Sequence, residues 1–173
     1  MRHSFIIPAM LVSAIVLGGL LYLYGGPAFT EPLTTENPAA GDPRGAQFQT
    51  IAKGQSALSQ DRRANFRIKT PEEFARLWEM IYSNNGPALP YVDFSREEVI
   101  AAFDGSHSTG GYGVTITEVR DADGVRTVKI ERTEPGEACA VTTGIESPFH
   151  LVRVDKSVFP LVREESIVIT PCL

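Results

Sequence analysis

The sequence holds 173 residues, of which 43% are hydrophobic and 21% are charged, a composition typical of a globular protein. Beyond residue 30 there are 15 Lys and Arg residues against 21 Asp and Glu residues, so this part carries a net charge of −6. This acidic balance argues against nucleic acid, or an anionic membrane surface, as the partner of the folded part.

An uncharged apolar segment of twenty residues, Phe5 to Tyr24, lies near the start of the chain. At the helical rise this length spans the hydrocarbon core of a bilayer, so we predict a transmembrane helix over residues 5–24. Arg2 precedes the segment, and Glu31 is the first charge after it. The positive-inside rule therefore leaves residues 1–4 in the cytoplasm and sends the rest of the chain across the membrane.

Removal of this segment as a signal peptide is the alternative, because Gly26-Pro-Ala28 resembles a small-residue cleavage site. The segment is longer than the usual apolar region of a signal peptide, which favours an uncleaved signal-anchor. No cysteine directly follows it, which excludes a lipoprotein anchor. The expected location is the cytoplasmic or inner membrane, crossed once, with the C-terminal domain periplasmic or extracellular.

Residues 25–47 show no hydrophobic periodicity, and we predict that they form a flexible linker. The segment is rich in proline, at Pro27, Pro32, Pro38 and Pro43. Alternation of apolar and polar residues begins at Phe48, so a single β-rich domain is predicted over residues 48–173.

The clearest element of this domain is a helix predicted over residues 71–82. Thr70-Pro-Glu-Glu73 combines a capping threonine, a proline at the first helical position and the glutamate of a capping box. An apolar stripe follows at helical spacing, formed by Phe74, Leu77, Trp78 and Ile81. We expect Trp78 to pack in the core and not to stack on a ligand.

Short alternating segments indicate strands on both sides of this helix. Two precede it, at Phe48–Lys53 and Ala64–Lys69, and the region Tyr91–Phe103 predicts one or two more, the second being Val99–Phe103. Those expected later in the chain are Gly113–Arg120, Val125–Thr133, Cys139–Thr143, Phe149–Asp155 and Ser166–Thr170. The expected turns are a hairpin at Asp121–Gly124 and a turn at Glu134–Glu137. The pattern favours an α+β fold, mostly antiparallel β with one clear amphipathic helix.

A glycine-rich corner, Asp104-Gly-Ser-His-Ser-Thr-Gly-Gly-Tyr-Gly-Val114, joins two of these strands. It has three interpretations: a structural turn with a bulge, a phosphate-binding loop, or a recognition loop on a β scaffold. The second needs a helix behind the glycines and a lysine before Ser or Thr, and the sequence has neither. We predict that Gly110 and Gly111 are required for the backbone shape. The binding residues predicted here are Ser108, Thr109, Gly110, Gly111 and Tyr112.

The same region carries a resemblance to a known family. Val92-Asp-Phe-Ser95, Gly105, Thr109-Gly-Gly-Tyr112 and Ser147-Pro-Phe-His-Leu-Val-Arg-Val154 resemble, in order and spacing, the C-terminal domain of the protease-complex subunit PrcB. The resemblance covers about residues 92–156. It implies an accessory protein of a bacterial cell-envelope protease complex and implies no catalytic residues.

Cys139 and Cys172 are the two cysteines of the chain, and both fall in the part predicted to be exported. Disulfides persist in such compartments, so we predict a Cys139–Cys172 bond. The alternative is a nucleophilic Cys139–His150 pair, which needs a third orienting group and a lowered thiol pKa. No cysteine-protease signature surrounds Cys139.

The remaining chemistry-bearing residues indicate neither a metal nor a cofactor. The domain contains two histidines, and their spacing matches no metal-binding motif. We expect His150 to be packed in a strand and His107 to be solvated on the corner. We interpret three carboxylates as solvated faces and caps: Asp93, Glu97 and Glu98. Two of them could instead form a glycosidase-like pair.

Two functional classes remain. The favoured one is a non-catalytic, membrane-tethered envelope binding module, an accessory or stabilising subunit of a protease complex, which would bind an envelope protein through the corner and exposed sheet edges. The alternative is a small hydrolase or ligand-binding domain that uses the corner as a pocket. A buried polar pocket with a strongly shifted pKa would favour the alternative.

Overall fold

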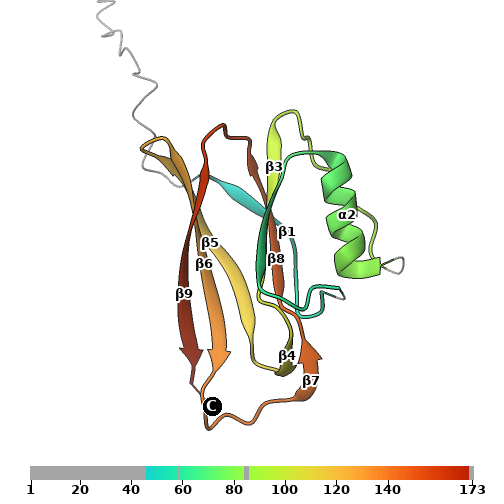
Figure 1. The fold of residues 1–173 in the computed structure, drawn as a ribbon, viewed down its shortest axis with the longest axis vertical. Coiled ribbons are helices and arrows are strands. Elements are labelled where there is room, and N and C mark those ends of the chain that lie inside the picture. Colours follow the sequence, from blue (N-terminus) through green and yellow to red (C-terminus); the bar gives the residue numbers. More distant parts are fainter. Residues whose placement is uncertain (1–45, 58, 84–85, 172–173) are drawn as a thin grey trace, which may run out of the picture. The chain divides into compact units, whose positions relative to one another are not determined.

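The computed structural model describes residues 46–57, 59–83 and 86–171 (Figure 1). The predicted membrane helix over residues 5–24, and nearly all of the predicted linker, lie outside them. Across the described residues, no helix combines the length and the apolar character that crossing a bilayer requires. The elements are β1 (Phe48–Gly54), β2 (Ala64–Ile68), α2 (Pro71–Tyr82), β3 (Glu97–Phe103), β4 (His107–Thr109), β5 (Gly113–Ala122), β6 (Val125–Pro135), β7 (Thr143–Glu146), β8 (Phe149–Asp155) and β9 (Leu161–Thr170).

The strands form three sheets. A four-stranded sheet has the order β1-β8-β3-β2, and every neighbouring pair in it is antiparallel. A three-stranded sheet has the order β5-β6-β9, in which β5 and β6 are antiparallel but β6 and β9 are parallel. The short strands β4 and β7 form a third, antiparallel pair. The predicted α+β, mostly antiparallel fold with one helix is confirmed over the described residues, and the parallel pairing of β9 is a feature that strand alternation cannot reveal.

Helix α2 begins and ends at the residues predicted from its sequence. The Thr70 hydroxyl accepts a hydrogen bond from the Glu73 amide at 3.2 Å, and the Glu73 carboxylate accepts one from the Lys69 amide at 2.9 Å. The apolar stripe of the helix is buried against one face of the four-stranded sheet. Trp78 lies in this core, as expected, and its indole N–H donates to the Pro87 carbonyl at 2.9 Å.

The two central strands of the four-stranded sheet, β3 and β8, are buried on both faces. One set of alternating residues contacts helix α2, for example Phe103 and Leu151. The other set packs against the three-stranded sheet, for example Ile100 and Val152. The domain therefore has three layers, with the helix on one side of the central sheet and the second sheet on the other (Figure 1).

Several predicted strand bounds were wrong. The first half of Tyr91–Phe103 is not a strand, because Asp93 starts a turn in which its carbonyl accepts from the amides of Arg96 and Glu97. Cys139–Thr143 is also not a strand, and the strand in this region is β7. The last strand starts at Leu161, five residues earlier than predicted, because it pairs with the full length of β6.

The hairpin predicted at Asp121–Gly124 is confirmed between β5 and β6. Asp123 and Gly124 both have positive φ, at 52° and 75°, which suits the turns that match the twist of paired strands. The strands on either side pair directly up to Ala122 and Val125.

Candidate functional site

The glycine-rich corner lies between β3 and β5 and includes β4. Its start is fixed by two backbone hydrogen bonds, from the Asp104 amide to the Pro148 carbonyl and from the Ser106 amide to the Asp61 carbonyl, each 3.0 Å. Between them, Gly105 has a φ of 84°, and an added Cβ would lie 2.9 Å from the Arg63 amide nitrogen. A side chain at this position would therefore meet backbone atoms as well as strain.

Gly110 and Gly111 are both constrained, but for different reasons. Gly111 has a φ of 94°, where glycine alone is comfortable, and an added Cβ would lie 3.0 Å from Pro135 Cβ. Gly110 does not have positive φ, but it is buried, and an added Cβ would overlap Thr142 Oγ1. The Gly110 amide also donates to the Thr142 carbonyl at 2.9 Å. The pair thus brings the corner close to the segment that leads into β7.

His107 is not solvated as predicted. Its ring stacks on the ring of Tyr112, with centroids 3.7 Å apart and planes 7° apart. Its Nε2 lies 2.8 Å from Asp104 Oδ2. Both rings are half-buried, so Tyr112 belongs neither to the apolar core nor to a freely exposed surface. The stack joins the two ends of the corner and holds β4 in place.

Asp104 is the charged centre of the corner, and no sequence pattern distinguishes it from a solvated carboxylate. Its carboxylate is buried, and Oδ1 lies 2.6 Å from Arg132 Nη1 and 3.1 Å from Arg63 Nη2. Arg132 also donates from Nε to the Glu165 carboxylate at 3.2 Å. The hydrogen bond from Arg132 lowers the pKa of Glu165, and this effect exceeds the opposite effect of burial.

The residues predicted to bind a partner differ in their solvent exposure. Ser108 is exposed and Thr109 is half-exposed, whereas Gly110 is buried and Tyr112 is half-buried. In the β4–β7 pair, His107 lies opposite Glu146 and Thr109 opposite Thr143. Two residues of β7 therefore lie opposite one residue of β4, Ser108, which is the geometry of a β-bulge.

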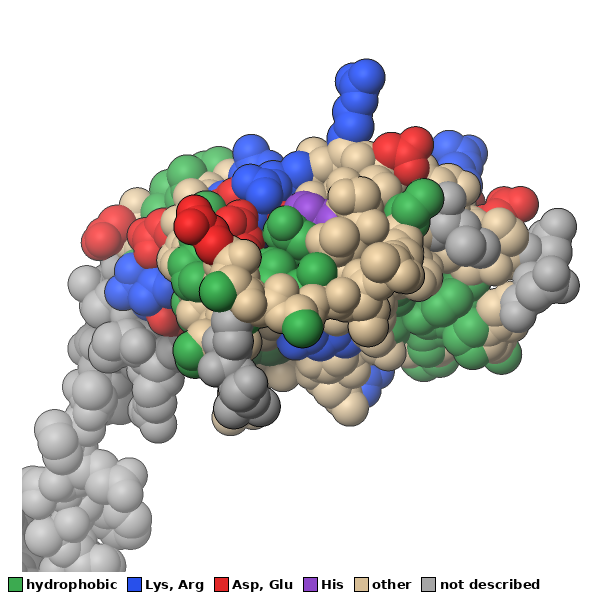
Figure 2. Space-filling view, turned by 90° about the horizontal axis from the view of Figure 1, so that it is seen from below, with side chains coloured by type: hydrophobic (Ala, Val, Ile, Leu, Met, Phe, Trp, Pro, Cys, Tyr) green, Lys and Arg blue, Asp and Glu red, His purple; other side chains and the backbone are tan. Residues whose placement is uncertain are grey.

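The bulge turns an apolar side chain outward beside Ser108. Its two residues are Gly144 and Ile145, and Ile145 is 78% exposed. Figure 2 shows this end of the domain, where apolar side chains and uncharged surface occupy the centre and most charged side chains lie toward the rim. The β4–β7 pair thus places the apolar side chain of Ile145 beside the hydroxyls of Ser108 and Thr109. A surface of this kind is suited to contact another macromolecule.

A cavity of about 340 Å³ lies next to the corner. It extends from Gly111 to the end of β9, and its lining is mostly apolar: Pro135, Cys139, Ala140, Val141, Thr170 and Pro171. No His and no carboxylate is among these residues. The cavity therefore offers shape and apolar contact but no general acid or base among its described residues.

Cys139 is half-buried at the edge of this cavity. Its Sγ lies 3.7 Å from the carbonyl oxygen of Thr170, two residues before Cys172. Cys172 lies outside the described residues, so the disulfide stays a prediction. A Cys139–His150 catalytic pair does not fit the structure, because Thr50 Oγ1 and the Ile116 amide, each at 2.9 Å, occupy the two ring nitrogens of His150.

His150 is a packed strand residue, as predicted, with 3% of its surface exposed. Its Nδ1 accepts the hydrogen bond from the Ile116 amide, which leaves the proton on Nε2 to bond with Thr50. Burial, with a smaller contribution from the charge of Lys53, lowers the pKa of His150 to about 4. The ring is therefore neutral near pH 7 and serves as a bridge from β8 to β1 and β5.

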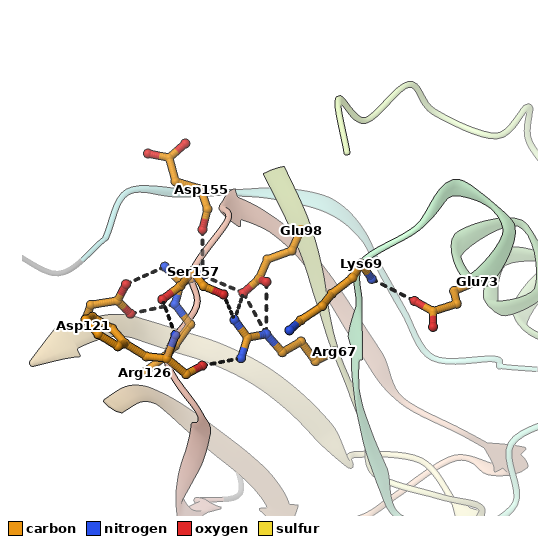
Figure 3. Close-up of polar contacts among 9 residues, drawn as sticks. Arg67, Lys69, Glu73, Glu98, Asp121, Arg126, Asp155 and Ser157 are labelled. Atoms are coloured by element: carbon orange, nitrogen blue, oxygen red, sulfur yellow. Dashed lines mark hydrogen bonds and ion pairs between the residues drawn. The ribbon is translucent and has the colours of Figure 1, made fainter. Parts of the chain in front are cut away.

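A second buried charge cluster lies at the opposite end of β3 (Figure 3). Glu98 is fully buried, not solvated as predicted, and its carboxylate accepts hydrogen bonds from Arg67 at 3.0 Å and Arg126 at 2.7 Å. Arg126 also donates to both carboxylate oxygens of Asp121, at 2.6 and 2.9 Å. Burial alone would raise the pKa of Asp121, but the hydrogen bonds and charge of Arg126 outweigh it and lower that pKa.

This cluster also fixes the loop between β8 and β9. Arg67 donates to the carbonyls of Ser157 and Phe159, at 2.5 and 2.6 Å, and Arg126 donates to the Asp155 carbonyl at 2.7 Å. Glu98 therefore cannot serve as one of a free pair of catalytic carboxylates. The other two candidates are the predicted caps, since Asp93 accepts from the Ser95 amide at 3.1 Å and Glu97 accepts from the Asp93 amide at 3.2 Å.

Three layers and a braced corner at the edge of the central strands define a small α+β domain built around antiparallel sheets. Residues 99–155, about a third of the chain, match the model of the family described as PrcB C-terminal. The match begins in β3 and ends with β8, so it contains the whole corner. The resemblance read from the sequence is confirmed over these residues. Comparison with curated proteins and with solved structures found no match.

Proposed function

We propose that this protein is a non-catalytic binding module of the bacterial cell envelope that acts as an accessory subunit of a protease complex. The match of residues 99–155 to the PrcB C-terminal family supports an association with such a complex. The observation that carries the proposal is the corner itself. Its buried residues hold its backbone in place, and the outer side of the corner and of the paired strand β7 exposes Ser108, Thr109 and Ile145.

The partner would be an envelope protein that contacts this outer side. The contact would combine apolar burial at Ile145 with hydrogen bonds to the hydroxyls of Ser108 and Thr109. Because β4 is already held by the His107–Tyr112 stack and by Asp104, little ordering of the corner would accompany binding.

The location proposed for this function follows from the sequence. Residues 5–24 would anchor the chain in the inner membrane, and residues 25–47 would tether the domain on the periplasmic or outer side. In that oxidising compartment Cys139 and Cys172 would form a disulfide. The position of Cys139 Sγ beside the carbonyl of Thr170 supports this pairing.

The test is affinity purification of the full chain from membranes, followed by mass spectrometry. We expect an envelope protease or a protein bound to one to co-purify with the native chain. Ser108→Ala and Ile145→Ser should each reduce its recovery while the unfolding temperature stays within about two degrees of native, since both side chains are exposed. An exposed apolar residue elsewhere provides the matched control, Val158→Ser, which should leave recovery unchanged.

Full recovery with both corner variants would locate the functional surface elsewhere. The second candidate function, a small hydrolase or ligand-binding domain, would use the cavity of about 340 Å³ beside Gly111. The strongly shifted histidine, His150, is not among the residues that line it. An apolar small molecule that binds this cavity in the purified chain, in place of a protein partner, would favour that candidate.

A further inference from the structure

Strand β9 forms one edge of the three-stranded sheet (Figure 1). All ten of its residues pair with β6, from Leu161 opposite Arg126 to Thr170 opposite Pro135, without a shift of register. Its other edge pairs with no strand among the described residues. A long, regular strand with one free edge is an available template for another strand.

The direction of the backbone groups on this edge follows from two hydrogen bonds. The Arg126 amide donates to the Pro160 carbonyl at 2.8 Å, and the Gly136 amide donates to the Thr170 carbonyl at 3.1 Å. Alternate residues of β9 therefore turn their N–H and C=O groups toward β6. The residues between them turn theirs toward the free edge: Leu161, Arg163, Glu165, Ile167 and Ile169.

Natural proteins protect free edges with charged side chains, especially lysine, and with proline, a bulge or a covering element. Strand β9 contains no proline, no lysine and no bulge, and its charged residues, Arg163, Glu164 and Glu165, lie together near its centre. It instead exposes large apolar side chains, at 49% for Val162, 57% for Ile167, 43% for Val168 and 57% for Ile169. The part of this edge beyond the charged residues is apolar and exposed, which makes it available for pairing with another strand.

We propose that two copies of this chain associate by antiparallel pairing of β9 with β9, which joins two three-stranded sheets into one continuous sheet. The sequence of β9 is self-complementary for this purpose, because Arg163, Glu164 and Glu165 lie between apolar residues at both ends. With the two-fold axis at Glu164, Arg163 of each copy faces Glu165 of the other. In the same register Leu161 faces Ile167, so these two pairings match opposite charges and apolar side chains, while Val162 faces Ser166.

The backbone geometry agrees with this register. In an antiparallel pair, residues that exchange hydrogen bonds alternate with residues that do not. Arg163 and Glu165 both turn their backbone groups toward the free edge, so they can exchange hydrogen bonds across the axis. Glu164 turns its groups toward β6 and falls at a position without such bonds, where the two side chains come closest.

Glu164 facing its own copy is the unfavourable contact of this interface, because like charges directly opposite each other repel. Lys129 lies beside it in register on β6, and its Nζ lies 2.8 Å from Glu118 Oε2. This cation offsets part of the repulsion. Neutralising Glu164 should therefore strengthen the association, and Glu164→Gln should raise the fraction of dimer at a given concentration.

A second copy is favoured over an unrelated strand by symmetry. A two-fold interface uses the same surface on both subunits, so every match must work in both directions. The apolar–charged–apolar order of β9 meets this requirement without help from any other part of the chain. The association is independent of the partner proposed for the corner, which contacts β4 and β7.

Cysteine cross-linking of the full chain, purified in detergent, tests the pairing and its register together. Opposed residues without hydrogen bonds have Cα atoms about 4.5 Å apart, within the range of about 4.4–6.8 Å that a disulfide spans. Under mild oxidation Glu164→Cys should give a covalent dimer. Val168→Cys is the matched control on the same face, and it should stay monomeric because its opposite in this register is Pro160. The native chain, with Cys139 and Cys172, shows the background.

Sedimentation of the full chain supplies a second measurement that does not need a new cysteine. Ile167→Lys should weaken the dimer at least tenfold, while Ile145→Lys, at an even more exposed isoleucine in β7, should not. Both variants should unfold at the native temperature. A native chain that sediments as a monomer, or equal cross-linking of Glu164→Cys and Val168→Cys, would overturn the proposal.

Discussion

Arg126 and Glu98 form an ion pair across the two main sheets, with Arg126 Nη1 2.7 Å from Glu98 Oε1 and both side chains almost completely buried. A second ion pair lies six residues further along each chain segment, where Arg132 Nη1 is 2.6 Å from Asp104 Oδ1. Both of these side chains are also buried. The apolar residues between the two pairs form the core of the sandwich. A buried charge pair therefore closes this core at each end.

Loss of the Glu98 charge should destabilise the domain strongly. Glu98→Gln would leave Arg67 and Arg126 buried with one carboxylate fewer, and breaking a buried pair in this way costs about 3–5 kcal/mol. Urea unfolding followed by fluorescence of Trp78 measures the change. Glu137→Gln, at an exposed turn, is the matched control and should stay within about 0.5 kcal/mol of native. Equal stability of the two variants would show that the pair contributes little.

The loop between β8 and β9 should lose its anchor when Arg67 is changed. Arg67→Met keeps an unbranched apolar stem but removes the donors to the carbonyls of Ser157 and Phe159. We expect amide hydrogen exchange to rise in residues 156–159 more than in β1, because the hydrogen bonds of Arg67 go to Glu98, Ser157 and Phe159. Unchanged protection of this loop would count against the anchoring role.

The spacing of these charges shows what the sequence could and could not reveal. Glu98 and Asp104 lie six residues apart in β3 and its continuation, and Arg126 and Arg132 lie six apart in β6. Even spacing places each pair on one face of its strand, so this signal was present in the sequence. It could not be interpreted there, because the same pattern describes a solvated face. Only the packing of β3 on β6, which is a long-range feature, distinguishes the two.

Local signals predicted the elements that depend on local physics. The Thr70 cap, the helix α2 and the Asp123-Gly124 turn are all specified by neighbouring residues, although the Glu73 carboxylate bonds the Lys69 amide and not that of Thr70. In contrast, the parallel pairing of β9 with β6 is set by distant contacts, and the exposed residues of β9 carry little alternation. The stack of His107 on Tyr112 likewise depends on how β4 folds back, which glycine content alone does not determine.

The stability of the domain should depend on pH through His150. Burial lowers its pKa in the folded state to about 4, whereas an unfolded histidine has a pKa near 6.5. As pH falls between these values the unfolded chain binds the proton first, so the free energy of unfolding decreases. We expect this group to remove about 2 kcal/mol between pH 7 and pH 5.

Urea unfolding at the two pH values, compared between the native chain and His150→Gln, isolates this effect. Glutamine does not titrate, so the variant should be less stable than native at pH 7 but show a smaller decrease toward pH 5. Carboxylates such as Asp121 titrate lower and are common to both proteins, so they cancel in the comparison. Parallel pH dependence of the two proteins would contradict the assignment.

The predicted Cys139–Cys172 disulfide should fix the end of β9 to the segment beside the corner. Non-reduced peptides from envelope-derived protein should contain the two cysteines linked. Cys172→Ser should lower stability by about 3–4 kcal/mol in the chain-entropy model, and reduction of the native chain should have a similar effect. Two cysteines that are both alkylated without reduction would contradict the bond.

The corner glycines should respond to substitution in different ways. Gly111→Ala would meet both positive φ and Pro135, so it should cost at least about 1 kcal/mol that no single second change restores. Gly144 has ordinary φ and open space around it, so Gly144→Ala is the matched control and should be nearly neutral.

Gly110→Ala should also destabilise the domain, because the new methyl group would overlap Thr142 Oγ1. Here the conflict is with one side chain and not with the backbone conformation. Thr142→Ala should therefore restore much of the stability lost in Gly110→Ala, and a double-mutant cycle measures this coupling. Thr142 is exposed, so Thr142→Ala alone should be nearly neutral. Additive effects in the cycle would show that Gly110 is required for another reason, such as the hydrogen bond from its amide to the Thr142 carbonyl.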